Sequence, residues 1–245
     1  RIPVDSVLFY GDPNALATGM LGASVTQAVP PRATEPRSLS ACVHTFAAIP
    51  LGVDLACHNV FFCADPQDEF GPLGEGKPPR DATVYVCAQD RFGDAVPTGP
   101  ERFETITNAP PVADKTPLTQ EDHEQCHSAI LQRLKAFGLH FSPRPAAQTL
   151  TLPQNFSALF PASNGSLYGR SPHGMMAAFQ RPTVRSRIKG LYLVGGGVHP
   201  GAGIPMATLC AAHAAEAITQ DLSLTSTSRP EATPGGTSMG SPTMA

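Results

Sequence analysis

Short apolar segments separated by turn-forming residues fill the first half of the chain. Four of them have the length and composition of β-strands: Leu39–Ile49, Asn59–Cys63, Thr83–Cys87 and Arg102–Thr107. Clusters of Pro, Gly and Asp between them, such as Asp65–Pro66 and residues 71–79, mark turns. Strands joined by turn-rich gaps predict a mostly antiparallel sheet.

Helical periodicity is clearest between Thr119 and Phe137. Ile130, Leu131, Leu134 and Phe137 recur on one helical face, and Gly138 ends the pattern. A second helix, rich in small residues, is predicted from about Gly203 to Ile218. It follows a short apolar strand at Leu191–Val194, so the two form a strand–loop–helix unit.

The ends of the chain complete this outline. Val4–Tyr10 is predicted to be a strand, and Asn14 is predicted to cap a short helix that runs to about Leu21. Residues 29–37 are rich in Pro and charge and are interpreted as a linker. After Asp221 the sequence becomes a Ser/Thr/Pro/Gly-rich tail, which we expect to be disordered because it has little apolar surface to bury.

Composition narrows the possible function classes. The chain has 245 residues, enough for one large or two modest domains, and a net charge of −3. Without a broad basic field, we expect no nucleic-acid partner. No apolar run reaches the roughly 20 residues of a membrane-spanning helix.

Cysteine and histidine spacing favours no metal site. The six Cys residues form no CxxC pair, and reduced thiols of a cytoplasmic protein are the expected state. His123 and His127 lie one helical turn apart beside Cys126, but no third ligand is evident nearby. We therefore interpret them as a solvated helix face and expect no bound metal.

The glycine-rich loop of the strand–loop–helix unit does not match the dinucleotide fingerprint G-x-G-x-x-G. Gly195 and Gly197 are followed by Pro200 where the third glycine belongs, and Gly201 and Gly203 are followed by Met206. The glycines still indicate that backbone lies close against something. Free N–H groups at the start of the following helix suit an electron-rich cofactor edge as well as a phosphate.

The run LYLVGGGVHPGAGIPMATLCAA resembles the C-terminal flavin-binding signature of bacterial carotenoid desaturases of the phytoene-desaturase type. These are FAD-dependent enzymes of the amine-oxidase-like superfamily. NVFFCADPQDEF, ATVYVCAQDR, NAPP and GSLYGRSPHGMMAAFQRP are similar to the same group, and most similar to hydroxyneurosporene desaturases. The resemblance covers roughly Ile2 to Ile218.

This resemblance implies an α/β fold, the C-terminal half of a two-domain FAD-dependent oxidoreductase whose N-terminal half would carry the dinucleotide fingerprint. Residues 1–23 would supply a strand and helix of a Rossmann-like FAD domain, and residues 38–150 a mixed sheet-and-helix substrate domain. Residues 151–221 would return to the FAD domain, and residues 222–245 would be the disordered tail. The residues implied to contact FAD are Gly195, Gly196, Gly197, Val198, His199, Gly203, Ile204, Pro205 and Met206.

The substrate implied by the resemblance is a carotenoid, desaturated on a membrane surface by a cytoplasmic, peripherally associated enzyme. The segment most similar to hydroxyneurosporene desaturases contains Arg170, His173 and Met175, which are the candidate substrate contacts for a 1-hydroxycarotenoid. No side chain stands out as a catalytic base. A phytoene desaturase, a carotenoid isomerase, or a non-catalytic carotenoid- or lipid-binding remnant are the alternatives.

Two histidines keep more than one interpretation from sequence alone. His199 would either contact the flavin or substrate, or hold the turn through a backbone hydrogen bond. His173 would either face the substrate channel or lie in an exposed loop with Arg170. Met175, Met176, Phe179 and Met206 would line an apolar tunnel or pack in the ordinary core.

Overall fold

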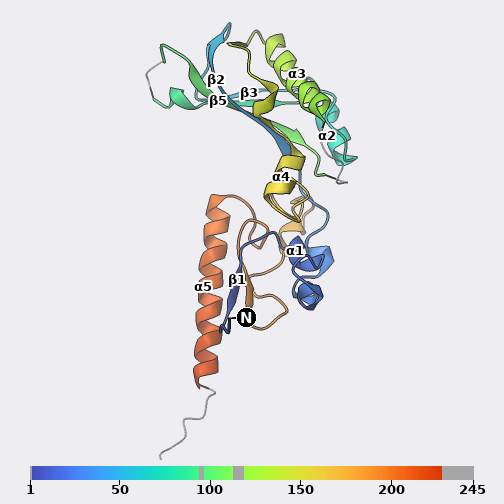
Figure 1. Cartoon of the computed structure of the whole chain (residues 1–245), viewed down its shortest axis with the longest axis vertical. Coiled ribbons are helices and arrows are strands. Elements are labelled where there is room, and N and C mark those ends of the chain that lie inside the picture. The colour runs from blue at the N-terminus through green and yellow to red at the C-terminus, as the bar shows by residue number, and fades with distance from the viewer. Residues whose placement is uncertain (1, 94–96, 113–118, 228–245) are drawn as a thin grey trace, which may run out of the picture.

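The computed structural model describes residues 2–93, 97–112 and 119–227. Within these ranges the chain is a mixed α/β protein with two sheets and two apolar cores. Figure 1 shows the larger sheet with its helices at one end of the molecule and the smaller sheet with a long helix at the other. All six cysteines are free thiols.

The larger sheet has the strand order β3-β4-β5-β2-β6, and β7 also pairs with β2. Its strands are β2 (Ser40–Leu51), β3 (His58–Phe61), β4 (Val84–Ala88), β5 (Glu101–Ala109), β6 (His140–Ser142) and β7 (Leu150–Thr151). Every pairing in it is antiparallel. The predicted antiparallel sheet is therefore confirmed, with strand ends shifted by one or two residues.

Helix α3 (Gln120–Ala136) packs on one face of this sheet, as the helical periodicity predicted. Ile130 and Leu134 of the helix share a buried core with Val84, Val86 and Phe103 of the strands. In β5, buried residues alternate with residues of intermediate or high exposure, so side chains of the opposite face are uncovered.

One predicted turn region is wrong, because residues 66–74 form helix α2. Asp65 caps it by accepting a hydrogen bond from the Gln67 N–H at 2.9 Å. Pro66 follows at the first helical position, where its missing N–H costs nothing. The Asp–Pro pair therefore starts a helix here instead of closing a turn. The sequence interpretation also missed α4 (Pro153–Leu159).

The smaller sheet pairs the two ends of the sequence. Strand β1 (Val7–Phe9) runs parallel to β8 (Leu191–Leu193), with Val7 opposite Leu191. Helix α5 (Ile204–Thr227) follows the glycine-rich loop and packs beside this sheet (Figure 1). Cys210 and Ala214 of α5 are buried with Leu193 and Val198 in the second core.

Three expectations for this part of the chain need correction. Helix α5 continues to Thr227, so residues 222–227 of the expected tail are helical; residues 228–245 lie outside the described residues. Helix α1 spans only Asn14–Ala17. Asn14 does not cap it: its own N–H bonds to Asp12 Oδ1 at 2.9 Å, and its side-chain amide donates to the Ala162 carbonyl oxygen.

The expected linker at residues 29–37 is a structured part of the second core. Val29 is fully buried and Ala33 packs in the same cluster. Arg37 forms an ion pair with Asp12, and both side chains are nearly buried. Arg37 also donates to the Ser163 carbonyl oxygen, so this segment connects residues that lie far apart in the sequence.

Candidate functional site

The glycine-rich loop, residues 194–203, joins β8 to α5 and borders open space at its end, beside Gly203. Gly203 has a φ of +97°, which L side chains rarely adopt, and a Cβ placed there would meet no atom within 4 Å. A Cβ at Gly197 would instead lie 2.8 Å from Pro13 Cδ. Gly203 therefore borders the open side of the loop, and Gly197 faces the protein.

Contacts within this chain account for the glycine at position 197, because the space beside Gly197 is filled by the chain itself. Pro13 lies on one side, and a Cβ added at Gly169 would approach the Gly197 Cα to 3.0 Å. The packing of three chain segments is enough to require glycine at this position.

Arg181 fastens the loop to the segment before it. This side chain, 6% exposed, donates from Nη1 to the carbonyl oxygens of Tyr168 at 2.8 Å and Gly196 at 3.0 Å. Its Nη2 donates to the Arg170 carbonyl oxygen at 2.7 Å. A planar guanidinium suits such a set of fixed acceptors better than an ammonium group. Arg181 thus sets the position of the glycine loop relative to residues 168–170.

Positive charge gathers behind the loop. Burial, then the charges of Arg170 and Arg37, lower the pKa of Arg181, and Asp12 opposes this effect. Arg170 is 9% exposed, its Nη2 donates to Gln180 Oε1, and its Nε is buried without a partner among the described residues. Three guanidinium groups beside one carboxylate make this region favourable for a bound anion.

A hollow of about 330 Å³ opens beside the loop and the start of α5. It is lined by Tyr168, Pro172, Arg181, Pro200, Gly201, Ala202 and Gly203. The first turn of α5 contributes backbone N–H groups and the positive end of its dipole nearby. Apolar walls with backbone donors and a guanidinium fit the edge of a flat ring that carries carbonyl acceptors. The residues present therefore fit a flavin.

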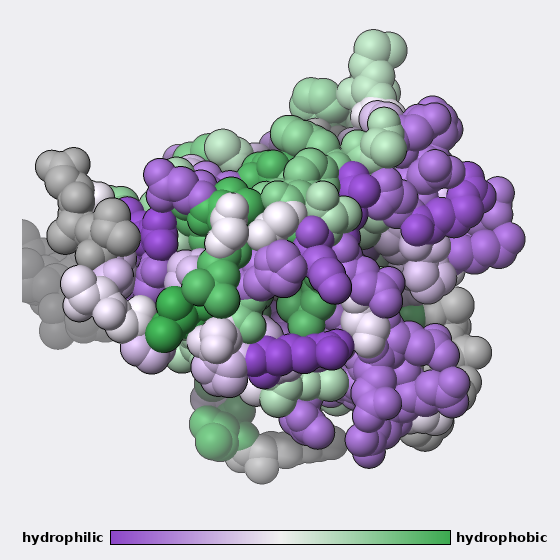
Figure 2. Space-filling model, turned by 90° about the horizontal axis from the view of Figure 1, so that it is seen from above, coloured by the Kyte–Doolittle hydropathy of each residue, from purple (hydrophilic) through white to green (hydrophobic). Residues whose placement is uncertain are grey.

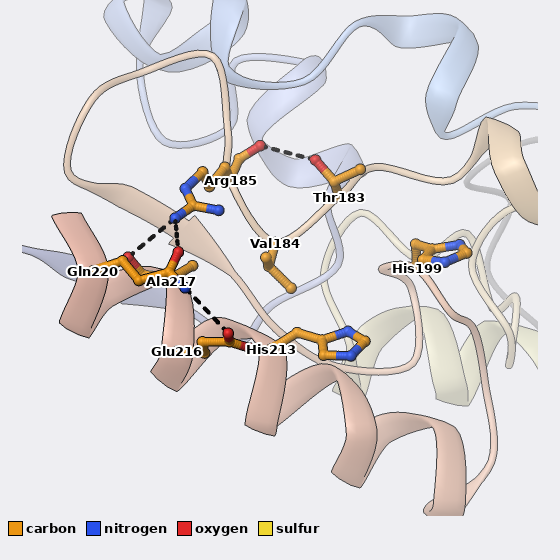
Figure 3. A pocket seen from close by; sticks show the side chains of 8 residues that line it. All are labelled: Thr183, Val184, Arg185, His199, His213, Glu216, Ala217 and Gln220. Carbon is orange, nitrogen blue, oxygen red and sulfur yellow. Dashed lines mark hydrogen bonds between the residues drawn. The ribbon is translucent and has the colours of Figure 1, made fainter.

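His199 lines a second hollow of about 280 Å³, together with Thr183, Val184 and Arg185 (Figure 3). Its backbone N–H donates to the Pro182 carbonyl oxygen at 2.8 Å, so its backbone does hold the turn. Its ring stacks on Phe179 with the centroids 6.2 Å apart. His213 and Glu216 of α5 line the same hollow, which is separate from the one beside Gly203.

The remaining residues that were implied to contact FAD differ in solvent exposure. Val198 is 1% exposed and packs in the second core, so only its backbone can meet a ligand. Ile204, Pro205 and Met206 are exposed at the start of α5. These residues and Gly203 form one continuous surface at the end of the loop.

The candidate substrate contacts differ in burial. Arg170 lies behind the loop, whereas His173 is exposed and Met175 is 94% exposed. Met176, Phe179 and Met206 are 54%, 73% and 42% exposed, so core packing is the wrong interpretation for them within this chain. Pro172, beside His173, reaches the hollow at Gly203.

Sequence analysis missed the residues that support the loop, chiefly Arg181, Arg37, Asp12 and Tyr168. Arg181 lies in the GSLYGRSPHGMMAAFQRP segment, whose resemblance to carotenoid desaturases could have drawn attention to it. Nothing in the spacing of Asp12 and Arg37 indicates that they pair.

Comparison with known proteins shows extensive similarity to one group of enzymes, although no protein-family model matches the chain. It is 52% identical over 221 residues to the hydroxyneurosporene desaturase of Cereibacter sphaeroides, covering 90% of this chain and 44% of that protein. For the Rhodobacter capsulatus enzyme of the same name, identity is 49% with the same coverages.

Two further relatives extend the comparison. The hydroxyneurosporene desaturase of Rubrivivax gelatinosus is 42% identical, covering 99% of this chain and 47% of that protein. A 4,4'-diapolycopene oxygenase of Methylomonas is 29% identical, over 70% of this chain and 36% of its own length. The chain thus spans less than half the length of these relatives.

Proposed function

Because the chain is homologous over 90% of its length to hydroxyneurosporene desaturases, we propose that it is part of a FAD-dependent carotenoid desaturase. The substrate is a 1-hydroxycarotenoid, which gains a new C=C bond during carotenoid biosynthesis. The observation that carries this proposal is the 52% identity over 221 residues, which is 90% of this chain.

Desaturation removes two hydrogens from neighbouring carbons of the substrate, one as a hydride and one as a proton. Bound FAD would supply the hydride acceptor. The polyene stabilises positive charge that develops at an allylic carbon, so the protein's main tasks are to position the substrate and exclude water.

The surface at the end of the loop supports a role in flavin binding. Gly203 leaves the space beside the loop open to a ligand. Ile204 and Met206 contribute backbone N–H groups in the first turn of α5, whereas Pro205 has no N–H. The helix dipole and the Arg181 guanidinium both favour negative charge on a reduced flavin at this place. Gly195 and Gly196 shape the loop from within.

Exposed apolar side chains beside the loop support a carotenoid substrate. Met175, Met176, Phe179 and Met206 present flexible or flat apolar surface that water does not favour. A long apolar ligand, together with the remainder of the full-length protein, would cover them. Arg170 and His173 would then provide polar groups for the terminal hydroxyl.

Carotenoids dissolve in membranes, so we propose that the enzyme works at a membrane surface. Among the described residues, no helix combines the length and apolarity required to cross a bilayer. Seen from the end that holds the larger sheet, apolar side chains lie among hydrophilic ones, which predominate on the right of the view (Figure 2).

The test is to produce the full-length protein in bacterial hosts that accumulate hydroxyneurosporene, phytoene or another unhydroxylated carotenoid. We expect bound flavin and a product with two hydrogens fewer, formed from the hydroxylated substrate. Conversion of phytoene alone would instead show a phytoene desaturase, and a product of unchanged mass an isomerase. A flavin-free protein that retains carotenoid without converting it would support the binding-remnant alternative.

A further inference from the structure

A cluster of three metal-ligand side chains lies in the larger sheet, away from the glycine-rich loop. Cys57 directly precedes β3, His58 opens that strand, and Cys87 lies opposite His58 on β4. The Ala88 N–H donates to the Cys57 carbonyl oxygen at 2.8 Å, which fixes the two chain segments against each other. One ligand atom from each side chain lies within 4.8 Å of the other two.

The cluster lies on the sheet face opposite α3. Val84 and Val86 of β4 are fully buried against the core that includes α3, whereas Tyr85 and Cys87 between and after them are not. His58 is exposed, and both thiols are partly accessible. An ion from solution can therefore reach all three ligands without opening the core.

Hydrogen bonding orients His58 toward the thiols. Its Nδ1 lies 2.7 Å from the Tyr85 hydroxyl, and its Nε2 lies 3.8 Å from Cys57 Sγ. The Tyr85 hydroxyl oxygen can accept a hydrogen bond from the Nδ1–H and leave Nε2 free to bind a cation, as second-sphere partners of metal-bound imidazoles do.

We propose that Cys57, His58 and Cys87 bind a zinc ion, with water at the fourth position. Two thiolates and one imidazole are a donor set that zinc favours, at about 2.3 Å for sulfur and about 2.0–2.1 Å for nitrogen. Binding releases the two thiol protons to solvent and requires no oxidant. Glu104, directly opposite Cys87 on β5, adds negative charge beside the site.

The sequence spacing concealed this site because its ligands come from two strands. Cys57 and His58 are adjacent, and Cys87 is separated from them by helix α2 and the segments around it. Only the antiparallel register of β3 and β4 brings Cys87 opposite His58. Zinc bound here would link the chain before β3 to β4 on the uncovered face.

The experiment measures zinc in the full-length protein, purified under reducing conditions, by elemental analysis and by competition with a chromophoric chelator. We expect about one tightly bound zinc per protein, lost in Cys57→Ser and in Cys87→Ser. Cys63→Ser is the matched control and should keep its zinc, because Cys63 is not part of the cluster. Tyr85→Phe should weaken binding roughly 10–100-fold while leaving all three ligands in place.

Cobalt substitution provides a readout that does not depend on the folding of a variant. Replacement of zinc by Co²⁺ in the unaltered protein should produce thiolate-to-cobalt absorption. Failure of the reduced protein to bind zinc would overturn the proposal, as would full zinc binding by both serine variants. A Cys57–Cys87 disulfide, with no zinc uptake after its reduction, would also overturn it and identify a redox pair instead.

Discussion

The Arg181 guanidinium donates a hydrogen bond of 3.0 Å to the Gly196 carbonyl oxygen, and the two residues are 15 positions apart in the sequence. The same guanidinium holds the Tyr168 and Arg170 carbonyl oxygens. The glycine-rich loop is therefore positioned by a side chain that precedes β8, and its geometry depends on a buried cation.

Arg181→Met should reduce both stability and flavin content of the full-length protein. Three carbonyl oxygens would lose their donor, and each buried group left unsatisfied costs about 1–3 kcal/mol. Arg181→Lys should restore little, because one ammonium group cannot reproduce the fork of donors. Arg32→Met is the control, because Arg32 is an exposed arginine. Normal flavin content and an unchanged melting temperature in Arg181→Met would show that Arg181 does not support the loop.

Gly197→Ala should destabilise the protein through its contact with Pro13. The new Cβ would lie 2.8 Å from Pro13 Cδ, and overpacking of this kind costs about 1–3 kcal/mol. Pro13→Ala removes Cδ and Cγ, so the double variant should recover part of the loss. Urea unfolding of both single variants and the double variant measures this coupling. Purely additive losses would show that the contact with Pro13 is not the cause.

Asp221→Asn should lower stability near neutral pH and have less effect in acid. The Asp221 carboxylate accepts from the Tyr192 hydroxyl at 2.8 Å and from Arg185 Nε at 3.1 Å. Arg185, then Tyr192, hold the Asp221 pKa below its ordinary value of 3.8. Because the folded-state pKa is the lower one, this stabilisation is present above about pH 4 and is lost as the pH falls further.

Unfolding of the unaltered protein and Asp221→Asn, followed at several pH values, measures this difference. The gap between the two should be largest at neutral pH and close as the pH falls through the native pKa of Asp221. A gap that stays constant over this range would show that ionisation of Asp221 does not contribute.

His173→Phe should lower turnover of the 1-hydroxy substrate more than turnover of its dehydroxy analogue. A buried hydroxyl that loses its partner costs roughly 1–3 kcal/mol, which corresponds to a change of about 5–150-fold in the ratio of kcat/KM values. His140→Phe, at an exposed histidine of β6, is the matched control. Equal loss on both substrates would remove His173 from hydroxyl recognition.

The sequence by itself determined the elements whose signals are local. Alternating apolar residues located β2, β4 and β5, the helical stripe of Ile130 and Leu134 located α3, and the motif around Gly195 located the strand–loop–helix unit. It also carried the resemblance to carotenoid desaturases. Local signals failed where the same short sequence is compatible with two structures. Asp65–Pro66 starts a helix as readily as it makes a turn.

Tertiary structure alone decided which distant residues meet. The pairing of Asp12 with Arg37, the contact of Pro13 with Gly197, and the approach of Cys87 to His58 leave no periodic trace in the sequence. Each depends on strand register and on the packing of segments that are remote in sequence. Periodicity indicates which face of a helix or strand is buried. It does not specify which segment packs against that face, because this depends on the arrangement of all the elements.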